Sequence, residues 1–246
     1  MVKFFRVLFR WIVILLSTFN FLFAEVEIIV PSFDKTEIEV VYHNGQENDP
    51  FVILISDKDS DLEQWKLFKD KLLDKGWGFL GYVPRVFEYG KEHRGTRKLW
   101  RKKSRYATGI LLRDLDAILM YLELNYQTQI NTNRIILVGA GLGANIALIY
   151  AVSNKNIKEV VLISPGREYG AVSTRSAILS YGNRPIMFMA SEEDDYSYQT
   201  CLDYITYLSG SNSFRVKFYY VNKHGMEFLT DYKVIRDIFS WLELHN

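Results

Sequence analysis

The sequence predicts an α/β fold in which a largely parallel sheet of about eight strands has helices on both faces. Short runs rich in β-branched and aromatic residues alternate along the chain with stretches of helical periodicity. The 246 residues are 48% hydrophobic, enough to bury one large core. Cys201 is the sole cysteine, so no internal disulfide contributes to stability.

The first 24 residues have the pattern of a secretory signal peptide. Lys3, Arg6 and Arg10 precede an uncharged run of 14 residues from Trp11 to Ala24, and Glu25 follows directly. That run is short for a bilayer span, which needs roughly 20 residues. We therefore expect a signal peptide over 1–24, an exported periplasmic or extracellular protein, and a single domain over 25–246. An uncleaved membrane anchor is the alternative, because residues 4–9 are also largely apolar.

The expected elements follow in chain order. Residues 25–30 and 36–43 are predicted to form an antiparallel pair of strands, and further strands are expected at 51–56, 77–83, 134–140, 159–164, 184–190 and 214–221. Helices are expected at about 61–74, 109–124 and 227–244, with others between the later strands. A long polar segment, 84–106, separates the fourth strand from the next helix.

The stretch "IILVGAGLGANIALIYA", residues 135–151, reads as a buried strand, a tight turn and a helix. Gly139, Gly141 and Ala144 fit the dinucleotide pattern G-x-G-x-x-G/A. That motif also requires an acidic residue at the end of the next strand, where this chain has Ser164 and Pro165. The competing pattern is G-x-S-x-G, a nucleophile elbow, with Gly141 at the serine position.

An elbow of this kind is followed along the chain by an acid and then a histidine. Asp194 follows a later strand in "RPIMFMASEEDDYS", with Glu193 and Asp195 as alternatives. His224 follows the last strand in "FYYVNKHGMEFL". Order and position both indicate that Asp194 and His224 are the acid and the histidine.

On these motifs the chain resembles the α/β-hydrolase family, of the small esterase or dienelactone-hydrolase-like kind, over about residues 36–245. The resemblance implies that Asp194 and His224 are a vestigial catalytic dyad and that Gly141 stands at the nucleophile position. It assigns the oxyanion or ligand-binding region to Leu142, Ser56 and Asp57. It implies a small acyl or ester-like ligand and neither a cofactor nor a metal.

The chain departs from that family at two places in the expected site. Gly141 has no side chain and cannot attack a carbonyl, although glycine enters the positive φ of an elbow without strain. The loop "ILISDKDSD" places Asp57, Asp59 and Asp61 where a developing anion would have to be stabilised, which is the wrong sign of charge. An acidic loop that caps the following helix explains these residues better than a cation site does.

Charge is strongly segregated along the chain. Residues 91–106 hold eight Lys and Arg against one Glu, whereas residues 25–246 as a whole have 27 basic against 29 acidic side chains. Such a segment could contact an anionic membrane surface. Bulk charge and export argue against a nucleic-acid partner.

Two functions remain open from the sequence. The first is an exported pseudo-hydrolase that has lost the serine mechanism and binds a ligand. The second is an active hydrolase in which His224 and Asp194 activate a water, or in which Ser164 or Ser191 replaces the missing nucleophile.

Overall fold

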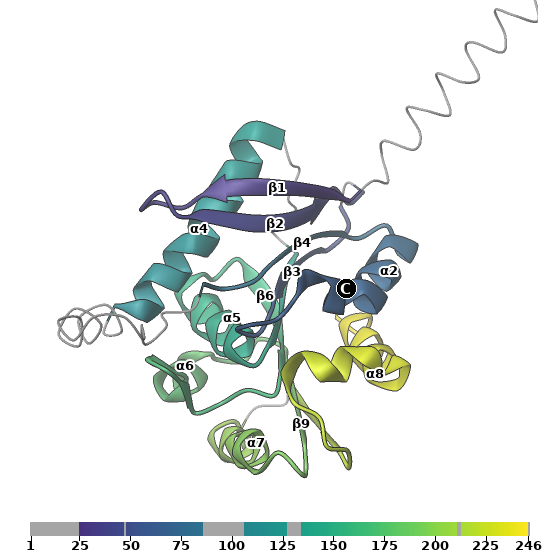
Figure 1. Ribbon diagram of the computed structural model, residues 1–246. Coiled ribbons are helices and arrows are strands. Elements are labelled where there is room, and N and C mark those ends of the chain that lie inside the picture. The colour runs from purple at the N-terminus through teal and green to yellow at the C-terminus, as the bar shows by residue number, and fades with distance from the viewer. Residues whose placement is uncertain (1–24, 47, 86–105, 127–133, 211–212, 246) are drawn as a thin grey trace, which may run out of the picture.

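The computed structural model describes residues 25–46, 48–85, 106–126, 134–210 and 213–245, and in this part of the chain one central sheet contains eight strands. They are arranged in the order β1-β2-β4-β3-β5-β6-β9-β10 (Figure 1). The strands are Val26–Pro31 (β1), Glu37–His43 (β2), Phe51–Ile55 (β3), Gly78–Tyr82 (β4), Ile135–Ala140 (β5), Ile157–Ile163 (β6), Ile186–Ser191 (β9) and Phe214–Tyr219 (β10). β2 is antiparallel to β1 and β4, and every pairing from β4 to β10 is parallel.

The central strands are continuous apolar runs because both faces of the sheet are covered. Alternate residues of one strand enter different cores: Ile53 packs in one cluster and Val52 in the other. The first cluster packs under α4 (Ala107–Tyr126), α5 (Leu142–Ser153), α6 (Arg175–Ser180) and α7 (Asp195–Tyr207). The second packs under α2 (Lys66–Asp74), η2 (Gly225–Thr230) and α8 (Tyr232–Leu242), and α2 and α8 lie side by side in Figure 1.

Two expected helices differ from the structure at their starts. The first begins as a 3₁₀ turn, η1 (Leu62–Trp65), which Asp61 caps, and then continues as α2. The prediction that the last helix begins near residue 227 is wrong. η2 occupies Gly225–Thr230, and extended backbone at Asp231 separates it from α8. The Asp231 carboxylate accepts the backbone N–H of Lys233 and so starts the last helix afresh.

Some expected features lie outside the described residues, namely the 1–24 segment and most of the basic segment 91–106. A two-stranded hairpin, β7 (Glu168–Tyr169) and β8 (Val172–Ser173), was not expected. Within the described ranges we find no helix with both the length and the apolar character that a bilayer crossing requires.

Candidate active site

The turn after β5 is a sharp elbow centred on Gly141. The residue has φ +53° and ψ −119°, and α5 begins at the next residue. The Gly141 N–H donates to the carbonyl oxygen of Ile163 at 2.9 Å, which anchors the turn to β6. This backbone is strained for any residue with a Cβ and free for glycine, so the expectation of a positive φ at this position is confirmed.

Asp194 and His224 meet at the carboxyl ends of the last two parallel strands. Asp194 follows β9 and caps α7, where its Oδ1 accepts the backbone N–H of Ser197 at 3.3 Å. His224 follows β10, and its Nδ1 lies 2.6 Å from Asp194 Oδ2. The backbone N–H of His224 donates to Glu227 at 2.9 Å and fixes the loop. The structure thus joins the two residues that the motif order had paired.

Each member of this pair favours the charged form of the other. The hydrogen bond to Asp194 raises the pKa of His224 against the opposing effect of burial, and the charges of Asp194, Asp57 and Glu227 raise it further. Burial raises the pKa of Asp194, but the hydrogen bonds from His224 and Ser197 outweigh burial and leave that pKa lowered. The contact therefore stabilises an aspartate beside an imidazolium relative to the two isolated groups.

Asp57 reaches into the elbow from the loop after β3. Its Oδ1 accepts the backbone N–H of Leu142 at 2.9 Å and that of Lys58 at 2.8 Å. Its Oδ2 lies 3.7 Å from His224 Nε2. A Cβ placed on Gly141 would lie 2.2 Å from both Cγ and Oδ2 of Asp57. The Asp57 carboxylate therefore occupies the space beside the elbow that a side chain at position 141 would need.

Ser56 and the two candidate replacement serines form hydrogen bonds with groups other than the side chains of the dyad. The Ser56 hydroxyl accepts Trp65 Nε1–H at 2.7 Å and its backbone N–H donates to the Tyr82 carbonyl at 3.1 Å, so the structure does not bring Ser56 to the dyad. Ser164 Oγ accepts the backbone N–H of Gly225 at 2.9 Å. Ser191 Oγ donates to the carbonyl oxygen of Val221, and both candidate serines are fully buried.

Tyr169 belongs to the site although no sequence motif indicated it. Its hydroxyl lies 3.5 Å from His224 Nε2 and 3.2 Å from the carbonyl oxygen of Ser164, and the two rings are T-shaped at 6.1 Å. Burial raises the pKa of this phenol, so Tyr169 stays protonated at neutral pH. It comes from the short strand β7, for which the pattern "PGREYGAV" contains no recognisable signal.

The rest of the acidic loop has a structural role. Asp61 forms a capping box with Gln64, accepting the backbone N–H of Glu63 while Gln64 accepts that of Asp61. The described residues hold no group of three or more side chains that could bind a metal ion. Of the three aspartates, Asp61 therefore caps a helix and Asp57 accepts a backbone N–H group at the elbow.

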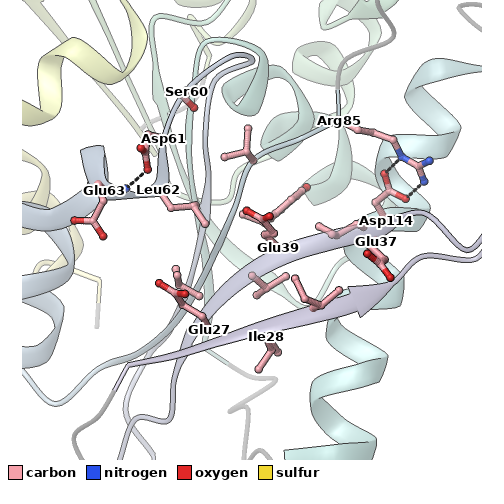
Figure 2. Close-up of a pocket in the computed structure, with 16 residues that line it drawn as sticks. Glu27, Ile28, Glu37, Glu39, Ser60, Asp61, Leu62, Glu63, Arg85 and Asp114 are labelled. Carbon is pink, nitrogen blue, oxygen red and sulfur yellow. Dashed lines mark hydrogen bonds and ion pairs between the residues drawn. The ribbon is translucent and has the colours of Figure 1, made fainter.

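A separate groove of about 830 Å³ lies beside β1, β2 and the turn that leads into α2 (Figure 2). Six acidic residues and one arginine line it: Glu27, Glu37, Glu39, Asp61, Glu63, Asp114 and Arg85. Figure 2 shows Arg85 directed at Asp114, which its Nε reaches at 2.6 Å. The groove thus gathers part of the negative charge that balances residues 91–106, and neither member of the dyad lines it.

Comparisons with known proteins agree with this geometry. The family model described as "Dienelactone hydrolase family" matches residues 40–234. A putative dienelactone hydrolase from Klebsiella pneumoniae superposes with a TM-score of 0.66 at 15% identity, over 89% of this chain and 98% of that one. The Pyrococcus furiosus esterase Pf2001 gives 0.64 at 13% identity, over 89% and 92%, and an Exiguobacterium antarcticum esterase 0.59 at 14%, over 89% and 100%.

No curated protein matches the sequence. At these low identities the solved structures establish the fold alone, an α/β-hydrolase fold with its eight-stranded, mostly parallel sheet. The family match covers well over half of the chain and explains the order of elbow, acid and histidine. The chain belongs to the dienelactone hydrolase family.

Proposed function

We propose that this hydrolase-like protein is a pseudo-hydrolase toward esters: it binds a ligand at the dyad but does not cleave esters through an acyl-enzyme. One observation carries the proposal, the Asp57 carboxylate in the space beside the bare Gly141. The attacking oxygen of the serine mechanism is missing. In addition, Asp57 Oδ1 already accepts the Leu142 N–H, the donor that a substrate carbonyl oxygen would need.

A hydrolase that uses His224 and Asp194 to activate water is the second candidate. The 2.6 Å contact within the dyad favours it, as does the exposure of 41% of the His224 side chain, which leaves the imidazole within reach of solvent. The raised pKa of His224 opposes it, because it lowers the fraction of neutral imidazole that can take a proton from water. Ser164 and Ser191 are poor replacement nucleophiles because both are buried and hydrogen-bonded.

Ester hydrolysis separates the two candidates. Purified protein and a His224→Ala variant would be assayed with short-chain p-nitrophenyl esters and with a fluorophosphonate probe. A pseudo-hydrolase gives no ester turnover above the His224→Ala background and no labelled serine. Turnover that disappears with His224 would establish the dyad hydrolase instead, and a labelled serine would overturn the proposal.

Export is a separate proposal that rests on the pattern of residues 1–24 alone. Mass spectrometry of the native protein should find an N-terminus at Glu25. A full-length chain in the membrane fraction would indicate an anchor, and one in the cytosol would contradict both.

A further inference from the structure

The two oxygens of the Asp57 carboxylate have different surroundings. Oδ1 accepts two backbone N–H groups, from Leu142 and from Lys58, and is fixed by them. No hydrogen bond is found for Oδ2 among the described residues, and it faces His224 Nε2 at 3.7 Å. The Asp57 side chain is 19% exposed, so a small molecule can reach it from solvent.

A carboxylate in this position can act as a nucleophile. Aspartate and glutamate form covalent ester intermediates in several enzyme classes. Here the two N–H donors orient the group, and Gly141 leaves the space for it. Its free oxygen also adjoins a histidine that is itself held by an acid, Asp194. Nucleophile, histidine and acid are therefore all present, with the nucleophile supplied by the loop after β3.

The groups around Oδ2 indicate which electrophile would suit this nucleophile. His224 Nε2 lies 3.7 Å from Oδ2 and 3.5 Å from the Tyr169 hydroxyl, and it carries a proton whenever His224 is an imidazolium. A proton donor next to a nucleophile can protonate a leaving group that departs as an alkoxide. A strained cyclic ether meets this need, because ring opening creates an alkoxide without releasing a fragment.

We propose that Asp57 is a carboxylate nucleophile and that this site converts epoxides to diols through a covalent Asp57 ester. Oδ2 attacks a ring carbon, the C–O bond of the ring breaks, and the oxygen takes the proton from His224 Nε2. The imidazole, now neutral, removes a proton from a water that attacks Asp57 Cγ. The resulting oxyanion forms on Oδ1, which the N–H groups of Leu142 and Lys58 already hold.

Collapse of that intermediate breaks the ester C–O bond and returns the proton from His224 to the departing alkoxide. The Asp57 carboxyl group that this step forms then gives its proton to His224. Epoxide and water thus yield a diol, and the carboxylate and the imidazolium are regenerated. The proposal goes beyond the absence of ester hydrolysis and does not depend on it, since the bond cleaved is an ether C–O bond at a saturated carbon.

Isotope labelling provides the test. The full-length protein, in excess over 1,2-epoxyhexane, would react for a single turnover in H₂¹⁸O. Because water attacks Cγ, the label should enter the peptide that contains Asp57, and the first diol should carry unlabelled oxygen. Asp57→Asn should lose diol formation by at least about 100-fold, a loss typical of a missing catalytic group, whereas Asp59→Asn in the same loop should retain it. His224→Gln, which lacks both the proton donor and the base of these steps, should lose diol formation as well. A covalent adduct trapped on Asp57 of the unaltered protein should add the mass of the epoxide.

Label found only in the diol would overturn the covalent step, and the absence of both diol and adduct would overturn the whole proposal. Equal activity in Asp57→Asn would do the same. If Asp57→Asn fails to fold, the position of the label in the unaltered protein still decides. The ester assays described above remain silent in either case, so failure here leaves the proposed function intact.

Discussion

The acid–histidine half of the site, Asp194 and His224, joins two side chains in direct contact, whereas in the nucleophile half, Gly141 and Asp57, the glycine has no side chain and the carboxylate lies in the space beside it. The first half depends on two side chains that lie 30 residues apart and still meet at 2.6 Å. In the second half, a Cβ at position 141 and the Asp57 carboxylate cannot coexist without movement.

This difference shows that the glycine at position 141 and the aspartate at position 57 depend on one another. Because position 141 is glycine, there is room for the carboxylate of Asp57. That carboxylate accepts the backbone N–H of Leu142 at the elbow. The space beside Gly141 is therefore filled and the Leu142 N–H is paired, whereas a cavity or an unpaired N–H there would reduce stability.

The largest expected effect comes from Gly141→Ser. The positive φ strains a residue with a Cβ by about 1–3 kcal/mol. Overlap with Asp57 adds about 1–3 kcal/mol of the kind that overpacking causes. The free energy of unfolding, measured by urea denaturation, should therefore fall by about 2–6 kcal/mol.

Gly170→Ser is the matched control for that change. Gly170 has φ +61°, and a Cβ there would meet nothing within 4 Å. This variant should lose the strain component alone, about 1–3 kcal/mol. If Gly141→Ser and Gly170→Ser lose the same free energy, Asp57 does not occupy the nucleophile space in solution.

Combining Gly141→Ser with Asp57→Gly should reverse part of the loss. The overlap disappears, so the double variant should regain about 1–3 kcal/mol relative to Gly141→Ser alone. It also frees the Leu142 N–H for a substrate oxygen and places a hydroxyl near His224. We expect fluorophosphonate labelling and weak ester turnover in the double variant only. Labelling of Gly141→Ser alone would show that Asp57 moves aside easily.

The order of the motifs predicted that Asp194 and His224 lie together, which they do, but not that Asp57 contacts the elbow, and the reason is physical. Asp194 and His224 follow recognisable strands in a fixed order, so their meeting is implied by strand adjacency. Asp57 was recognised as having the wrong charge for an oxyanion site, but its contact with the elbow depends on the pairing of β3 with β5, where Ile55 lies opposite Gly139. A single sequence does not contain that register, nor does it reveal the path of the β7 hairpin that brings Tyr169 to His224.

Asp194→Asn tests the acid–histidine half with a smaller expected effect. Asp194, with its lowered pKa, stabilises the fold above the ordinary carboxyl pKa and loses that contribution as pH falls through its folded pKa. His224, with its raised pKa, contributes fully below its ordinary pKa of about 6.5 and loses that contribution as pH rises through its folded pKa. The dyad contribution should therefore be greatest between these limits.

The substitution should cost about 1 kcal/mol there, a charged hydrogen bond discounted for the exposure of the imidazole. Urea denaturation at pH 5.5 and at pH 9 would measure it. A cost equal at both pH values would mean that the imidazolium plays no part in holding the dyad.

The smallest expected effect is the change in the pKa of His224 in Asp57→Asn, and this change compares the two halves directly. Asp194 raises that pKa through a hydrogen bond and through its charge, whereas Asp57 contributes charge alone across 3.7 Å. Glu227 and Tyr169 also face the ring and are unchanged in both variants. Proton NMR titration of the His224 Cε1–H signal should show a lowered pKa in both variants, with Asp194→Asn lowered further. Should Asp57→Asn lower it as far as Asp194→Asn does, the 3.7 Å separation closes to a direct hydrogen bond in solution, and Asp57, His224 and Asp194 titrate as one unit.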